Sequence, residues 1–112
     1  MLLSIAREES MRDKRLPLRE AVGLIEPGGQ IGLTSPSLDN APMAVIREII
    51  RQRLTDLHLV TLTGGSLNAD LLIGSGLLAE YETCSCTFGS LGKAPNFDRA
   101  VKSDLLHLKD NT

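Results

Sequence analysis

Apolar positions along this chain alternate between short runs, typical of buried strands, and longer stretches with helical spacing. The two kinds meet most clearly between Gly28 and Ile50. The segment from Gln30 to Thr34 is mostly apolar and too short for a helix, so we expect a strand there. Beyond it, an apolar stripe at helical spacing predicts an amphipathic helix: Val45, Ile46, Ile49, Ile50 and Leu54.

The start of this helix carries two signals. Asp39 or Asn40 is expected to cap it, because a short side-chain oxygen accepts hydrogen bonds from the free N–H groups of a first turn. Pro42 is expected within that turn, where no N–H is needed. The polar loop from Thr34 to Asn40 therefore joins the carboxyl end of a strand to a helix N-terminus. Open α/β sheets bind polar and anionic ligands at such places.

The segments on either side of this stretch predict one further helix and one further strand. A short helix begins with Pro17 in its first turn and stops at Pro27-Gly28-Gly29. It is expected to pack against the sheet through an apolar stripe made of Leu18, Ala21, Val22, Leu24 and Ile25. The segment from Leu57 to Leu62 has apolar residues at both parities, which is typical of a strand covered on both faces.

The second half of the chain repeats the pattern. A short helix is predicted from Asn68 to Ile73, and a strand rich in Thr, Cys and Tyr from Glu80 to Thr87. Helical spacing resumes over residues 97–108, at Phe97, Val101, Leu105 and Leu108. The three predicted strands are separated by about twenty residues with a helix in each gap, as parallel neighbours require. The predicted fold class is therefore α/β, an open and mainly parallel sheet with helices on both faces.

Two regions are expected along the chain. Residues 1–15 carry alternating charges without a core pattern, and we expect a poorly ordered N-terminal extension there. Met11 offers an alternative start, which N-terminal sequencing of the native protein tests. Residues 16–112 are expected to form the α/β domain.

The carboxyl ends of the predicted strands are expected to meet at one edge of the sheet, because crossovers are right-handed. That edge collects three loops: Thr34-Ser35-Pro36-Ser37, Gly64-Gly65-Ser66 and Cys86-Thr87-Phe88-Gly89. Small residues let a ligand approach the backbone closely, and free N–H groups favour an oxyanion or a phosphate. The alternative interpretation is that turns in α/β proteins simply need Gly and Ser.

Composition and charge argue against nucleic-acid binding and against a membrane-spanning segment. The 112 residues carry a net charge of −2 and only 3% aromatic residues, so there is neither a basic surface nor a stacking platform for nucleic acid. No apolar run approaches the roughly 18 residues of a membrane span, and no signal-peptide pattern occurs. Two cysteines are typical of a reducing compartment, so the expected location is the cytoplasm.

The cysteines, histidines and arginines of the chain each have a structural explanation as well as a chemical one. Cys84 and Cys86 are expected to share one strand face, and a buried structural role is favoured for them over a nucleophile or a zinc site. Zinc would need two further ligands, and only His58 and His107 are on offer, so no metal site is predicted. Both histidines are interpreted as ordinary side chains. Three arginines complement the carboxyl end of the helix dipole: Arg47, Arg51 and Arg53.

The expected edge loops lack a convincing base, acid or nucleophile. Neither the Gly-x-Gly-x-x-Gly dinucleotide pattern nor a Gly-Lys-Ser/Thr phosphate loop is present. A self-sufficient enzyme needs a reactive group poised at its site. These loops are suited to positioning and oxyanion stabilisation, so the reactive group is expected to come from elsewhere.

Several segments in order resemble the A (alpha) subunit of the family I coenzyme A transferases, especially the glutaconate-transferase type. The resemblance runs from Leu16 to Asp104 and rests on order and spacing rather than on one motif. Its segments are Leu18-Arg19-Glu20-Ala21-Val22, the turn Pro27-Gly28-Gly29, Leu54-Thr55-Asp56-Leu57-His58-Leu59-Val60, Leu71-Leu72-Ile73-Gly74-Ser75-Gly76, and Phe97 with Arg99.

The resemblance implies an open α/β sheet and a reaction that moves coenzyme A between carboxylic acids. It implies a B-type partner subunit that carries the nucleophilic glutamate, with no catalytic residue in this chain. It also implies acyl-CoA and a small carboxylic acid as ligands, coenzyme A as substrate rather than a permanent cofactor, and an oligomer. The A subunit supplies a loop whose backbone holds the oxyanion, and part of the substrate pocket, here expected at Gly64, Gly65, Ser66, Thr87 and Gly89.

The oxyanion loop departs from the family pattern. Thr34-Ser35-Pro36 stands where the family has Gly-Gly-Phe, and Pro36 has no N–H to donate. The oxyanion contacts are therefore expected from Thr34, Ser35 or Ser37. Asn40 also departs from the acetate-type members, whereas Pro42 is retained. Two other classes stay open: a non-catalytic truncated homologue that acts as an assembly or binding module, and a hydrolase that uses Cys86.

Overall fold

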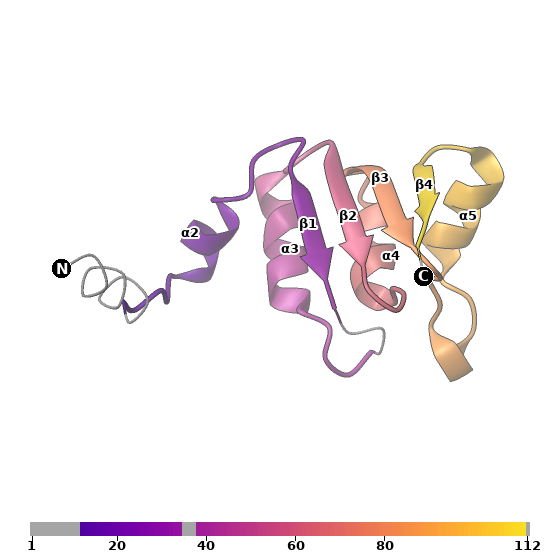
Figure 1. Ribbon diagram of the computed structural model, residues 1–112, viewed down its shortest axis with the longest axis horizontal. Coiled ribbons are helices and arrows are strands. Elements are labelled where there is room, and N and C mark those ends of the chain that lie inside the picture. The colour runs from indigo at the N-terminus through magenta and orange to yellow at the C-terminus, as the bar shows by residue number, and fades with distance from the viewer. Residues whose placement is uncertain (1–11, 35–37, 112) are drawn as a thin grey trace.

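The computed structural model describes residues 12–34 and 38–111 (Figure 1). The elements run in the order α2 Leu18–Val22, β1 Gln30–Leu33, α3 Met43–Gln52, β2 Leu57–Thr61, α4 Leu67–Gly74, β3 Leu78–Thr83, the 3₁₀ helix η1 Gly89–Leu91, α5 Pro95–Ser103 and β4 His107–Asp110. The starting residues 1–11, including the alternative start Met11, lie outside the described part.

A four-stranded parallel sheet in the order β1-β2-β3-β4 forms the centre of the fold. When neighbouring strands follow each other in this order, right-handed crossovers place every connecting helix on the same face. Figure 1 shows this arrangement, with α3, α4 and α5 together behind the sheet. The predicted open, parallel α/β class is confirmed. The helices expected on the second face do not occur within residues 12–34 and 38–111.

The two faces of β2 show what a single helical layer does to the burial pattern. Leu57, Leu59 and Thr61 point toward the helices and are fully buried, whereas His58 and Val60 on the other face are partly exposed. Leu62 lies beyond the strand and is 60% exposed. Apolar residues at odd and even positions of β2 thus misled the prediction, because helices cover only one face of this strand in the part of the chain that the structure describes.

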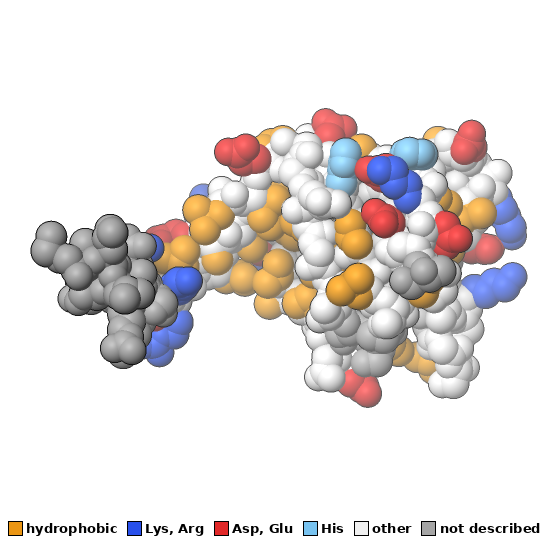
Figure 2. Space-filling view, viewed as in Figure 1, with side chains coloured by type: hydrophobic (Ala, Val, Ile, Leu, Met, Phe, Trp, Pro, Cys, Tyr) orange, Lys and Arg blue, Asp and Glu red, His pale blue; other side chains and the backbone are white. Residues whose placement is uncertain are grey.

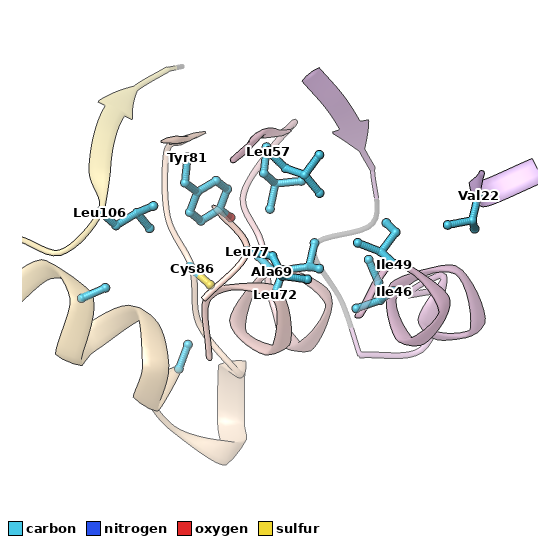
Figure 3. Close-up of a cluster of buried hydrophobic side chains, with 13 residues drawn as sticks. Val22, Ile46, Ile49, Leu57, Ala69, Leu72, Leu77, Tyr81, Cys86 and Leu106 are labelled. Atoms are coloured by element: carbon cyan, nitrogen blue, oxygen red, sulfur yellow. The ribbon is translucent and has the colours of Figure 1, made fainter. Parts of the chain in front are cut away.

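The hydrophobic core lies between this face and the helices (Figure 3). Ile46 and Ile49 of α3 and Leu72 of α4 pack beneath β2 and β3, where Leu57 and Tyr81 are fully buried. The predicted stripe of α3 is confirmed, since Val45, Ile50 and Leu54 are partly buried against the same cluster. None of the helices formed by the described residues is long and apolar enough to cross a membrane.

The start of α3 differs from the prediction. Pro42 is its N-cap rather than a first-turn residue, and no side chain caps the helix there. Asp39 and Asn40 lie in the preceding turn, too far along the chain from Met43 for either to be the capping residue. The helix ends at Arg53 in the left-handed conformation, φ 53°.

The first helix is shorter than predicted and has another neighbour. Helix α2 ends at Val22, its one fully buried residue, and Leu24 beyond it is 73% exposed. It packs against α3 rather than the sheet, and Gln52 donates a hydrogen bond of 3.0 Å from its side chain to the Arg19 carbonyl. The predicted stripe extended through Gly23, which ends the helix instead.

Strand boundaries differ most toward the C-terminus. Strand β3 spans Leu78–Thr83 instead of residues 80–87, so Cys84 and Cys86 lie past its end. The helical spacing over residues 97–108 conceals two elements, because α5 ends at Ser103 and β4 begins at His107. Asp104, at φ 54°, turns the chain between them. The third predicted helix is confirmed, as α4 contains the whole of residues 68–73.

Candidate functional site

Two of the three predicted edge loops are joined at the carboxyl ends of the strands. The N–H of Gly65 donates to the Ser85 carbonyl at 2.8 Å, and the N–H of Thr87 donates to the Gly65 carbonyl at 3.1 Å. These bonds form a parallel bridge between Gly65 and Cys86 beyond the ends of β2 and β3. Sequence reasoning placed the two loops together correctly, and we call them, with Thr34, the rim.

Thr34 is the part of the first loop that the structure describes. It follows β1 directly and is exposed, and the carbonyl of Leu33 before it accepts a 3.2 Å hydrogen bond from the N–H of Leu62. The end of β1 is therefore level with the end of β2, on the same edge of the sheet as the joined loops. Ser35, Pro36 and Ser37 lie outside the described residues.

Packing explains why the second loop needs two glycines. A Cβ on Gly65 would stand 2.1 Å from the Tyr81 hydroxyl oxygen and 2.9 Å from the Ala69 Cβ. Gly64 adopts φ +107°, and a Cβ there would come 2.7 Å from the Ser85 hydroxyl oxygen. Loop joining is thus a sufficient structural reason for both glycines, whether or not a ligand approaches them.

The N–H groups of this loop are largely committed within the protein. Besides Gly65 and Thr87, Ser66 donates its N–H to the side-chain oxygen of Asn68 at 3.1 Å. The Thr87 hydroxyl donates to the Gly92 carbonyl and accepts from the N–H of Gly89, each at 3.2 Å. A ligand would therefore meet these residues as a close-fitting wall, whereas Thr34 presents an exposed hydroxyl.

A buried hydroxyl network that sequence reasoning missed lies beneath the rim. The Thr61 hydroxyl lies 2.9 Å from the Tyr81 hydroxyl and donates to the Thr83 hydroxyl at 2.8 Å. Thr83 in turn donates to the Ser85 carbonyl at 2.7 Å. Burial raises the pKa of Tyr81 to about 12, so the phenol stays protonated. The network ties the ends of β2 and β3 to the joined loops.

A second missed feature is the buried carboxylate of Asp70, in the first turn of α4. It accepts hydrogen bonds from the Phe97 N–H at 2.8 Å and from the Asn96 amide at 3.1 Å. Both donors belong to the first turn of α5, so Asp70 fixes that helix against α4. The Phe97 ring also meets Tyr81 edge-on, with centroids 6.0 Å apart. Asp70 is therefore an anchor for α5 rather than a free acid at the rim.

The two cysteines have different surroundings, contrary to the shared strand face that was predicted. Cys84 is exposed and Cys86 is buried, since both lie past the end of β3, where alternation no longer holds. Burial, together with the nearby Asp70 carboxylate, raises the pKa of Cys86 to about 12. The favoured structural role fits Cys86, and a thiol in this state is a poor nucleophile.

The two histidines come together on the uncovered face of the sheet, near the amino ends of the strands. His58 Nδ1 and His107 Nδ1 each lie 3.1 Å from a Glu80 carboxylate oxygen, and Lys109 Nζ lies 2.9 Å from one of them. The hydrogen bond from Lys109 lowers the pKa of Glu80. Figure 2 shows the histidines beside charged side chains at that end of the sheet. This cluster is remote from the rim.

The chemistry of the rim follows from these contacts. Its described residues, Thr34, Gly64–Ser66 and Cys86–Gly89, include no carboxylate, imidazole or amine. Residues 12–34 and 38–111 contain no group of three His, Cys, Asp or Glu side chains that can hold a metal ion. The rim offers shape and hydroxyl groups, and it needs a reactive group from another source.

Comparisons with known proteins give this geometry a context. No family model matches the chain. It is 37% identical over 89 residues to the cholesterol ring-cleaving hydrolase IpdA subunit of Rhodococcus jostii, covering 80% of this chain. It is 35% identical over 88 residues to the corresponding subunit of Mycobacterium tuberculosis.

Two solved structures share the fold. Glutaconate coenzyme A-transferase from Acidaminococcus fermentans superposes with a TM-score of 0.77 over 89% of this chain, at 28% identity. The decarboxylase AibA/AibB superposes with a TM-score of 0.71 over 87%, also at 28% identity. The chain spans 28% of the length of the Rhodococcus relative and 32% of that of the transferase chain.

Proposed function

We propose that this chain is part of an A-type subunit of the family I coenzyme A transferases and that it holds an acyl-CoA at its rim. A B-type partner subunit supplies the carboxylate nucleophile. The observation that carries this proposal is the composition of the rim: a close-fitting wall and hydroxyl groups, without a carboxylate, imidazole or amine among its described residues. We expect the complex to act in the cytoplasm.

The proposed reaction divides one transfer into covalent steps. The partner's glutamate attacks the thioester carbonyl carbon, and the C–S bond breaks. Coenzyme A leaves as a thiolate, and the acyl group remains joined to the glutamate in a mixed anhydride. The thiolate then attacks the glutamyl carbonyl carbon, which releases the first acid and forms an enzyme–CoA thioester. An acceptor carboxylate reverses both steps and departs as the new acyl-CoA. No net oxidation or proton release occurs.

Each rim residue has a proposed part in this reaction. Thr34, with Ser35 and Ser37, donates to the oxyanion that forms on the thioester carbonyl. Gly64, Gly65 and Ser66 form the wall beside it, and Thr87 and Gly89 extend that wall. Because the N–H groups of Gly65, Ser66 and Thr87 are bonded internally, oxyanion donation is assigned to the first loop.

The test is reconstitution with a B-type partner. The chain alone is expected to give no CoA transfer from an acyl-CoA to a free acid, and addition of the partner restores it. The partner with its nucleophilic glutamate replaced by glutamine is the matched control. Inactivity with every B-type subunit encoded next to this chain would contradict the proposal.

A second candidate is a hydrolase that opens a ring of its substrate with water. The observation that favours it is the higher identity to the ring-cleaving hydrolase subunit, 37% against 28% for the transferase. In that case the reconstituted complex consumes water and passes no coenzyme A to an added carboxylic acid.

The replaced oxyanion loop supports a third candidate, a non-catalytic binding or assembly module. Substituting Gly-Gly-Phe for Thr34-Ser35-Pro36 discriminates among these proposals. A large gain in partnered activity would indicate that the natural loop has lost its catalytic part, whereas a loss would indicate that the natural loop is functional.

A further inference from the structure

A cavity opens between α4 and α5 near the amino ends of the strands, at the end of the sheet opposite the rim. The two helices pack against each other behind the sheet (Figure 1). The cavity has a volume of about 550 Å³ and is lined by the end of α4, the start of β3, and α5 with the turn after it. Small-molecule sites in proteins have volumes of roughly 300–1,000 Å³, so a ligand of that kind fits here.

Much of the cavity lining is apolar. Ala100 and Leu106 are each 6% exposed, and Ile73 and Leu78 pack against the same core cluster. Leu105, in the same lining, is 83% exposed, although covering a leucine side chain is favourable. The cavity therefore offers apolar surface to a ligand with an apolar body.

One cation of the lining, Arg99, is positioned by a chain of hydrogen bonds. The Asn96 amide nitrogen donates to the buried Asp70 carboxylate at 3.1 Å and to the Asp70 carbonyl at 3.2 Å. The Asn96 side-chain oxygen accepts a hydrogen bond from the Arg99 guanidinium. Gly74 makes room for this amide, because a Cβ there would collide with its nitrogen. Asp70 thus orients Asn96, and Asn96 orients the guanidinium, which has no part in the reaction proposed for the rim.

The charges around the cavity decide which anion it suits. Lys102 Nζ is paired with an Asp98 carboxylate oxygen at 3.0 Å, and the Ser103 hydroxyl donates to the Arg99 carbonyl at 2.6 Å. Within residues 12–34 and 38–111, no carboxylate oxygen lies within 4.0 Å of the Arg99 guanidinium. One guanidinium binds one carboxylate through two parallel hydrogen bonds. It balances a monoanion, whereas a phosphate dianion needs further donors.

We propose that this cavity binds a free carboxylic acid with an apolar body, whose carboxylate pairs with Arg99. The hydrocarbon part of the acid lies against Ala100, Leu105 and Leu106. None of the lining residues belongs to the rim, so this is a second site, and binding here does not depend on the reaction proposed for the rim.

The experiment is an NMR titration of the isotopically labelled full chain with octanoate, kept below the concentration at which it forms micelles. The amide signals of Gly76 and Leu105 at the cavity are expected to shift in a saturable way, whereas those of Gly65 and Thr87 at the rim stay unchanged. Acetate has the carboxylate without the apolar body, and octylammonium has the same body with the opposite charge. Neither is expected to give a saturable shift over the same concentrations.

Variants of exposed residues test the assignment to Arg99. Arg99→Met keeps an apolar stem and removes the charge, so the affinity for octanoate is expected to fall at least about tenfold, as for a lost hydrogen bond to a charged group. Lys102→Met removes a cation from the same lining and is expected to change the affinity by less than about twofold, because that lysine is paired at the surface. Arg47→Met on α3 is the matched control for net charge. Circular dichroism verifies that each variant is folded.

Five results overturn the inference: no shift with octanoate, shifts at Gly65 and Thr87 instead of the cavity, saturable binding of octylammonium, equal binding of acetate, or equal losses from Arg99→Met and Lys102→Met. The titration contains neither acyl-CoA nor a B-type subunit. Its failure therefore leaves the proposed function standing, and inactivity of the reconstituted complex leaves this site standing.

Discussion

At the scale of single residues, two glycines that look alike in sequence face different surroundings. Gly65→Ala places a Cβ within contact distance of the Tyr81 hydroxyl and Ala69, so we expect a loss of about 1–3 kcal/mol in the free energy of unfolding. Gly32→Ala is the control, because no heavy atom lies within 4 Å of its added Cβ. Urea unfolding measures both. Equal stabilities of the two variants would contradict the packing argument.

Thr34 is the rim residue on which the oxyanion proposal can be tested directly. Thr34→Val removes the hydroxyl at nearly constant volume and is expected to lower kcat of the partnered complex about 10- to 100-fold. Thr34→Ser keeps a hydroxyl and is expected to retain most activity. If Thr34→Val changes only KM, the hydroxyl binds substrate equally well before and during the reaction, and the oxyanion assignment is wrong.

The two thiols give a residue-scale test of burial. With its pKa raised to about 12, Cys86 is expected to resist a thiol reagent at pH 8, while the exposed Cys84 reacts. Cys84→Ser therefore abolishes rapid labelling of the folded chain, and Cys86→Ser leaves it intact. In the partnered complex, Cys86→Ala is expected to keep its activity. A severe loss there would revive the hydrolase that uses Cys86.

The residues that sequence reasoning missed share a physical reason. Asp70 and Tyr81 act through partners 20 or more positions away, at Phe97 and Thr61. Chain periodicity carries information about the face on which a side chain lies, but not about which polar group it meets. Strands β2 and β3 both end in a threonine, Thr61 and Thr83, on the helix-covered face, and this is the one feature of the sequence that pointed to the buried network.

At the scale of elements, Glu80 connects three strands through His58, His107 and Lys109. The hydrogen bond from Lys109 lowers its pKa below 4.5, so the carboxylate is favoured in the folded state. A lowered folded-state pKa gives stability that is present above the unfolded value and is lost as the pH falls through the folded value. The cluster therefore contributes at neutral pH and not in strong acid.

The corresponding prediction concerns Glu80→Gln. Its melting temperature is expected to lie below that of the wild type at pH 7, with a difference that shrinks once the pH falls below 4.5. Glu26→Gln, a change at an exposed residue in the turn before β1, is the control and should show no such pH-dependent difference. Thermal unfolding followed by circular dichroism from pH 3 to pH 7 measures both. A difference that grows toward acid would contradict the sign argued here.

The elements that could be predicted are those whose apolar residues face one packed layer. Helices α3 and α4 and strands β1 and β2 satisfy that condition, and their positions follow from the sequence within a few residues. Strand β4 does not, since it lies at an edge and has only Leu108 turned toward the core. The leucines in and before β4 continue the helical spacing of α5, so the sequence predicted one helix where the structure has a helix and a strand.

At the scale of the whole molecule, residues 12–34 and 38–111 form a sheet with one face covered by helices, one face without them and two edges. The α/β class could be predicted because parallel strands impose long crossovers, and those leave a visible alternation in the sequence. The absence of helices on the second face among the described residues could not be predicted. A strand with apolar residues at odd and even positions has the same sequence pattern whether or not helices of its own chain cover both faces. The exposed Leu62 shows that difference.

The final prediction distinguishes the two reactions proposed for the partnered complex. In transfer through an anhydride, the oxygen that the released acid gains comes from the enzyme's glutamate, which regains one from the acceptor acid. In hydrolysis, the added oxygen comes from water. We therefore expect acid released in ¹⁸O-labelled water to remain unlabelled, and acid released over several turnovers with ¹⁸O-labelled acceptor to acquire label, as measured by mass spectrometry. Label from water, in an amount equal to turnover, would instead place this chain with the ring-cleaving hydrolase subunits, to which it is 35–37% identical.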